Sequence, residues 1–477
     1  MNLEQDLEGA QLPLHVLREY ALVADGERGI LIGPRGEMAW MCAPHWDSDA
    51  IFSTLIGGAG TYAITPRDNR FVWGGFYEPG SLIWRSRWIT TNSVIECREA
   101  LKFPGDPSCA VILRRVVAVE GDGAVHVVLD PRAEFGLQPM TDLHLRDGVW
   151  SARCGALYLR WTGAESATLA NETSFILDLN LQAGTHHDFV LELSDHVLTD
   201  APHSANADWR ATESAWSAAV PHFDETLAPR DAQQAYAVLR GLTSAGGGMV
   251  AAATMSLPER ANAGRNYDYR YAWIRDQCYA GQAVAVNQAD PLLDDAVSFI
   301  TARLIVDGPT LKPAYRIDGS GVPSERSLPH LKGYPGGSDK LGNWVNGQFQ
   351  LDAFGETLLL FAAAGRHDHL DAENWRAVKI AVSAIAARWQ EPDAGIWEID
   401  NDHWTHSRLI CVAGLRAVAT TATSSERNEW NRLAETILAD ATANGVHRSG
   451  RWQRSPKDKR IDASLLLSSI RGAVPSD

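Results

Sequence analysis

One short stretch of the chain is rich in side chains that can recognise a sugar. The segment RNYDYRYAWIRDQCYAG, Arg265–Gly281, combines tyrosines and a tryptophan with arginines and aspartates at the start of a predicted helix. Flat aromatic faces stack on the apolar face of a pyranose ring, while arginine and aspartate offer donors and acceptors to its hydroxyls. The composition therefore fits a subsite for a small neutral sugar. An arginine–aspartate network that only holds the start of the helix explains the same residues equally well.

A second stretch contains a candidate proton donor. WQEPDAGIWEIDNDHWTHSR, Trp389–Arg408, places Glu398 directly after Trp397 in a loop between two predicted helices. A carboxyl beside a large apolar ring is desolvated, which raises its pKa and keeps it protonated near neutral pH, as a general acid requires. The competing interpretation is an exposed loop carboxylate, which is the commoner fate of a glutamate.

The elements before these stretches are predicted to be strands. From about Tyr20 to Ser194, short runs rich in β-branched and aromatic residues are separated by glycine, aspartate and proline. Apolar and polar positions alternate, which implies sheets with one buried face, and consecutive strands without intervening helices imply two packed sheets. We therefore predict an N-terminal antiparallel β-sandwich over residues 1–199.

The elements that carry the two stretches are predicted to be helices. Residues 200–230 have the pattern of a helical connector. In residues 231–477, eight segments place apolar residues at three- and four-residue steps, which is typical of helices that face a core. Some are joined by long loops rich in glycine and aromatics, such as residues 312–344, and loops of that length usually line a working site.

Composition limits the partners of the chain. The 59 acidic and 43 basic side chains give a formal net charge of -16, which repels nucleic acid and anionic lipid surfaces but permits a neutral ligand. Six scattered cysteines and several histidines lack metal-ligand spacing, so no metal site is expected. The sequence has no secretory leader pattern and no apolar run long enough to span a membrane, which predicts a cytoplasmic location.

Read together, these stretches resemble glycoside hydrolase family 15, the glucoamylases, glucodextranases and trehalases. The blocks that carry the resemblance follow the family's order: the opening run from Tyr20 to Gly58, then MVAAATMSLPE with GRNYDYRYAWIRD, QFQLDAFGE and EPDAGIWE. They extend over nearly the whole chain. The resemblance implies a β-sandwich, a connector and an (α/α)6 barrel of twelve helices, of which about eight are recognisable here, with glucose bound at one end of the barrel.

The resemblance also implies roles for single residues. Glu398 matches the general acid. Trp397, directly before it, is expected to contact the substrate. Arg275 and Asp276 match the pair that grips hydroxyls of the terminal glucose. The other residues implied to bind the sugar are Tyr269, Trp273, Gln350 and Asp352.

One part of the family's pattern is missing. Inverting hydrolysis needs a second carboxyl as general base, roughly 6.5 to 9.5 Å from the acid. In the family this base is a glutamate in a block resembling GELxGNFPQAFSH, and no such block occurs in the sequence. We therefore expect a truncated member, with a C-terminally incomplete helical domain over residues 231–477. A second copy or a partner chain would then cover the open barrel.

Three functions are consistent with these observations. The first is inverting, exo-acting hydrolysis of α-glucosidic bonds in oligosaccharides or trehalose, releasing β-glucose, a chemistry that needs no metal or organic cofactor. The second is an inverting disaccharide phosphorylase, in which phosphate is the nucleophile and no protein base is needed; strict dependence on phosphate would identify it. The third is a carbohydrate-binding remnant without turnover, which would bind glucose and release no product.

Overall fold

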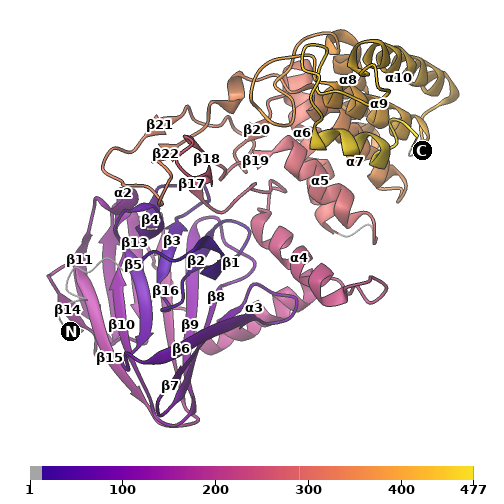
Figure 1. Cartoon of the computed structure of the whole chain (residues 1–477). Helices are drawn as coiled ribbons and strands as arrows, with labels where there is room; N and C mark the ends of the chain where they lie inside the picture. The colour runs from indigo at the N-terminus through magenta and orange to yellow at the C-terminus, as the bar shows by residue number, and fades with distance from the viewer. Residues whose placement is uncertain (1–12, 289–290, 476–477) are drawn as a thin grey trace. The chain divides into compact units, whose positions relative to one another are not determined.

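The computed structural model describes residues 13–288 and 291–475, which form two compact units (Figure 1). The first unit is built mainly from strands and the second mainly from helices. The first contains the residues up to Ala245, Ala252–Arg270 and Glu325–Leu341. The second contains Gly246–Ala251, Tyr271–Ser324 and the residues from Gly342 onward. The predicted domain limits at residues 199 and 230 follow sequence patterns alone and stay a prediction.

The first unit contains the predicted β-sandwich. One antiparallel sheet of eight strands has the order β11-β12-β13-β16-β9-β8-β7-β6, and a four-stranded sheet has the order β14-β15-β10-β5. The strands are β5 (Thr61–Pro66), β6 (Phe71–Tyr77), β7 (Trp84–Thr90), β8 (Val94–Leu101), β9 (Cys109–Glu120), β10 (Gly123–Asp130), β11 (Met140–Arg146), β12 (Val149–Cys154), β13 (Leu157–Thr162), β14 (Thr168–Ala170), β15 (Ser174–Leu181) and β16 (His186–Ser194).

Alternation of buried and half-buried residues produces this sandwich. Along β10, Val125, Val127 and Leu129 are buried while the residues between them are half-buried, as expected for a sheet with one face in a core. Both sheets contribute to the same core, in which Trp88 and Trp161 are fully buried. Large rings at these positions remove much apolar surface from water and hold the two layers together.

Smaller elements complete the first unit. A third sheet contains β1 (Ala21–Ala24), β2 (Gly29–Ile32), β3 (Met38–Cys42) and β4 (Ala50–Phe52). Two helices follow the sandwich, α3 (Ala205–Ala219) and α4 (Pro229–Leu242). Two pairs of short strands are β17 (Met255–Arg260) with β18 (Arg265–Asp268), and β21 (Arg326–Ser327) with β22 (Lys340–Leu341).

The second unit contains most of the predicted helices. They are α5 (Ile274–Val284), α6 (Pro291–Asp307), α7 (Leu351–Gly365), α8 (Ala372–Arg388), α9 (Thr405–Ala419), α10 (Ser424–Gly445) and α11 (Leu467–Ile470). A 3-10 turn, η5 (Ala463–Leu466), precedes α11. Together with α4 these confirm all eight predicted helical segments. No helix in the described part of the chain has the length and apolar character needed to span a bilayer.

Helices α7 and α9 pack most closely at two glycines. A Cβ at Gly355 of α7 would lie 2.7 Å from the backbone of Ile410, and one at Gly414 of α9 would lie 2.4 Å from the carbonyl of Gly355. No larger residue fits there without moving a backbone. Nearly every residue of both helices is buried, so this pair forms the interior of the helical unit and fixes the start of α7 beside the start of α9.

Candidate active site

The first part of the site is the N-terminus of α5. The short strand β19 (Ala272–Trp273) leads into this helix and pairs with β20 (Ala314–Tyr315), so that Trp273 lies opposite Ala314. The backbone amide of Ile274 donates to the carbonyl of Pro313 at 2.9 Å, which continues the pairing into the helix start. Trp273 and Arg275 are therefore fixed by backbone hydrogen bonds, and both side chains are buried.

The second part is the start of α7. Arg275 Nη1 donates to Gln350 Oε1 at 2.8 Å and lies 3.6 Å from Asp352 Oδ2. Gln350 Nε2 in turn donates to Gln348 Oε1 at 2.9 Å. The guanidinium thus links the two predicted segments RD and QFQLD. Asp352 is fully buried, so a charged partner is needed to compensate its desolvation.

The third part is the loop between α8 and α9, which carries Glu398. Glu398 Oε1 accepts one hydrogen bond from Trp273 Nε1 and one from Arg275 Nη2, both at 3.1 Å. The Glu398 side chain is 22% exposed, so it is reachable from solvent while its inner oxygen is held by buried donors. The structure therefore brings five predicted site residues into one connected set: Trp273, Arg275, Gln350, Asp352 and Glu398.

The remaining predicted residues have other surroundings. Asp276 follows Arg275 in the first turn of α5. Burial raises the pKa of Asp276; the positive charge of Arg275 lowers it, and the negative charge of Glu398 raises it further. Trp397 is 45% exposed, and its Nε1 donates to Asp462 Oδ1 at 2.8 Å, so its ring is held by the segment after α10. Tyr269 belongs to the first unit, where its hydroxyl donates to Glu259, and its role at the sugar stays a prediction.

Buried polar groups that the motifs did not single out surround the set. Burial raises the pKa of Glu356, one turn after Asp352 on α7, and lowers the pKa of His406 on α9 to about 4. Glu356 accepts from Gln282 Nε2 at 2.9 Å, and Gln282 accepts from Arg471 Nη1. Glu356 could have been found from the sequence, because it lies four residues after Asp352 on the same helix. The contact between Gln282 and Arg471 could not, because these residues are 189 positions apart and share no local pattern.

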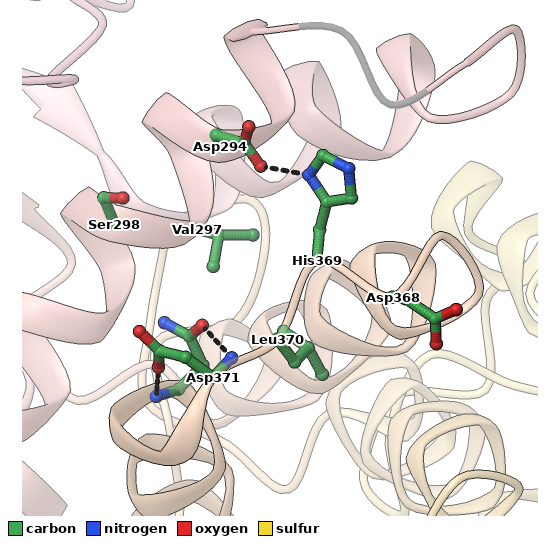
Figure 2. A pocket seen from close by; sticks show the side chains of 8 residues that line it. Asp294, Val297, Ser298, Asp368, His369, Leu370 and Asp371 are labelled. Atoms are coloured by element: carbon green, nitrogen blue, oxygen red, sulfur yellow. Dashed lines mark hydrogen bonds and ion pairs between the residues drawn. The ribbon is translucent and has the colours of Figure 1, made fainter.

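The acidic and histidine side chains do not gather into a metal site. Among the described residues, no three of the histidine, cysteine, aspartate and glutamate side chains are arranged to hold an ion. A separate pocket lies between α6 and the start of α8 (Figure 2). There His369 Nδ1 lies 2.6 Å from Asp294 Oδ1, and Asp371 accepts from the backbone of Asn374 as a helix cap. The pocket contains none of the predicted site residues.

The chain has a strand-built part followed by a helical part, and the helical part holds a partly exposed carboxyl against a buried indole and a buried arginine. These features fit an enzyme that cleaves carbohydrates. The model of glycosyl hydrolases family 15 matches residues 233–477, and a trehalase-like N-terminal model matches residues 7–193. The chain belongs to glycosyl hydrolase family 15 and is a glycoside hydrolase.

Individual relatives agree with this assignment. A trehalase of Mycolicibacterium smegmatis is 28% identical over 98% of this chain and 75% of its own length. A trehalase of Mycobacterium tuberculosis is 29% identical over 98% of this chain and 74% of its own. The crystal structure of a bacterial glucoamylase complexed with acarbose has a TM-score of 0.59 at 12% identity, covering 93% of this chain and 72% of that one. This last likeness confirms the predicted fold class.

Proposed function

We propose that the chain hydrolyses α-glucosidic bonds in small sugars of the trehalose type, with inversion and with Glu398 as general acid. The two mycobacterial relatives are trehalases, which supports a disaccharide substrate. The observation that carries the proposal is the convergence of Trp273 and Arg275 on one oxygen of Glu398.

That geometry suggests which oxygen of Glu398 would carry the proton. Both donors contact Oε1, and among the described residues Oε2 has no hydrogen-bond partner. In a neutral carboxyl the carbonyl oxygen accepts hydrogen bonds and the hydroxyl oxygen donates. The proton would therefore reside on Oε2, which would donate it to the glycosidic oxygen as the bond breaks.

The neighbouring residues would bind the sugar. Arg275 and Asp276 would hold hydroxyls of the terminal glucose, with Gln350 and Asp352 behind them. A hydroxyl offers both a donor and an acceptor, which suits an arginine beside a carboxylate. We assign no described carboxyl as the base, because the resemblance places that residue in a block that the sequence lacks. The water that attacks the anomeric carbon from the opposite face would then lose its proton to solvent, so turnover by this chain is expected to be slow.

The test is the substitution Glu398→Gln, which keeps the shape of the side chain and removes the proton. Hydrolysis of trehalose and maltose in phosphate-free buffer is expected to fall by about 10²- to 10⁴-fold, with an unchanged circular dichroism spectrum. The control is Glu373→Gln on an exposed part of α8, which should behave as wild type. By NMR, trehalose should at first release equal amounts of β-glucose, from the attacked ring, and α-glucose, from the leaving ring.

Three results would contradict the proposal. Wild-type rates in Glu398→Gln would remove that residue from the chemistry. Release of α-glucose alone from trehalose, before mutarotation, would exclude inversion. Turnover that appears only when phosphate is added would instead support phosphorolysis.

A further inference from the structure

The loop that carries Glu398 is organised around a buried aspartate, Asp393. Its carboxylate is fully buried and accepts from the backbone amide of Gly395 at 2.9 Å and from Ser407 Oγ at 2.8 Å. Arg408 Nη1 forms an ion pair with its other oxygen. Ser407 and Arg408 lie in the first turn of α9, so this one carboxylate connects the loop to the helix that follows it.

Further contacts fix the same loop at both ends. Arg408 Nη2 donates to the carbonyl of Glu391, on the α8 side of Asp393. The backbones of Asp393 and Asp402 exchange two hydrogen bonds, at 2.9 and 3.0 Å, which close the loop into a ring. The amide of Ala394 donates to the carbonyl of Phe349 at 2.8 Å, next to the site residues at the start of α7.

This anchoring continues to the backbone of Glu398. Gly395 has φ +62°, and a Cβ there would lie 2.5 Å from Trp404 Cδ1, so the turn begins where only glycine fits. The amide of Glu398 donates to the carbonyl of Gly395 at 3.4 Å, and Glu398 itself has φ +51°. A residue with a Cβ stays in this left-handed region only when its surroundings impose it.

We propose that Asp393, held by Ser407 and Arg408, is a positioning residue that keeps Glu398 in its working conformation. The inference rests on the proposed role of Glu398 as the acid. Asp393 reaches the sugar only through the loop, so its loss would misplace the proton donor and leave the Arg275 subsite intact.

The charge of Asp393 makes the pH dependence of kcat a test of its role, because a purely structural residue would not alter that dependence. Burial raises the pKa of Asp393 to about 7, and the charged groups that face it are Arg408 on α9 and Asp352 on α7. Above that pH the carboxylate and Arg408 form an ion pair, and below it protonation weakens the pair and loosens the loop. The kcat of the wild type is therefore expected to decline as pH falls through about 7.

The experiment compares Asp393→Asn with Asp400→Asn, an exposed carboxylate of the same loop. A misplacement near 1 Å can slow a reaction by about 10²-fold, so Asp393→Asn should lower kcat by that order with KM within about threefold of wild type. Its kcat should lack the decline near pH 7, because amides do not titrate. Asp400→Asn should retain both the wild-type kcat and the decline.

A second variant keeps the test informative if Asp393→Asn does not fold. Ser407→Ala removes one hydrogen bond to the carboxylate, which favours its neutral form, so the decline in kcat should move to higher pH. An unchanged decline in Ser407→Ala, or a wild-type kcat in Asp393→Asn, would overturn the inference. Wild-type activity in Glu398→Gln would instead overturn the proposed function, whatever the other variants show.

Discussion

At the scale of single residues, the site depends on the shape of one guanidinium. Arg275 uses Nη1 toward Gln350 and Asp352 and Nη2 toward Glu398, so three groups from two other segments are aligned by one planar fork. Lysine carries the same charge on a single nitrogen and cannot reproduce that fork. A substitution that keeps only the positive charge at this position is therefore not expected to keep the function.

The substitution Arg275→Lys should accordingly lower kcat/KM for trehalose by about 10²-fold, or roughly 3 kcal/mol, through loss of charge-assisted hydrogen bonds. Steady-state kinetics would measure the loss, and calorimetry with glucose would show weaker binding. Arg366→Lys, on the exposed end of α7, provides the control and should leave both values unchanged. Equal kinetics in the two variants would show that the fork has no role in turnover.

The same scale shows what local sequence could not predict. Trp397 precedes Glu398, and adjacency suggested that its indole would shield the acid. In the structure, the indole that contacts Glu398 is that of Trp273, 125 positions earlier in the chain. The indole of Trp397 instead donates a hydrogen bond to Asp462. The Arg275 and Gln350 motifs were found because each lies at the start of a helix with a clear apolar pattern, and Glu398 because it lies in the loop between two such helices.

At the scale of elements, helical periodicity predicted the helices because each must bury one face. The short strands in the long loop over residues 312–344 were not predicted, since two-residue strands such as β21 and β22 show no alternation. The close approach of α7 and α9 was also missed, because a glycine within a helical pattern does not reveal what lies against it.

This close approach leads to a prediction. Gly355→Ala should lower the melting temperature and destabilise the fold by about 1–3 kcal/mol, because the new methyl would press on the backbone of α9. The loss should exceed the gain in helix propensity of up to about 1 kcal/mol. Gly347→Ala, which meets no atom within 4 Å, should melt like the wild type. Identical melting of Gly355→Ala would mean that the helices can separate without cost.

At the scale of the whole molecule, the compact units are not continuous stretches of the chain. The first unit takes in Ala252–Arg270 and Glu325–Leu341, although both lie within the stretch that sequence pattern assigns to the helical domain. Local composition records strand and helix periods but carries no signal for such returns of the chain, because the contacts join residues far apart in sequence. The fold class could therefore be predicted, while the path of the chain between the units could not.

The stability of the whole protein should depend on the charge of His406. In the unfolded chain histidine titrates near pH 6.5, whereas burial lowers the pKa of His406 to about 4. Between these values the unfolded state binds a proton and the folded state does not, so stability falls as pH falls from 6.5 to 4, by roughly 3 kcal/mol. Urea denaturation across this range should show a shallower loss in His406→Asn.

The comparison needs a difference curve, because the raised pKa of Asp393 makes stability rise as pH falls throughout this range, which opposes the effect of His406. Subtracting His406→Asn from the wild type isolates the imidazole. His330→Asn, an exposed histidine, should follow the wild type. A difference curve independent of pH would show that His406 can be protonated in the folded protein.

At residue 398, thermal stability and the proposed turnover make opposite demands, because Glu398 has a left-handed backbone conformation. Holding a residue with a Cβ in that conformation costs roughly 1–3 kcal/mol, which glycine would recover while removing the proposed proton donor. Directed evolution that rewards survival after heating alone would thus drift toward dead enzyme at this codon. A screen for a hardier variant has to score released sugar in every round.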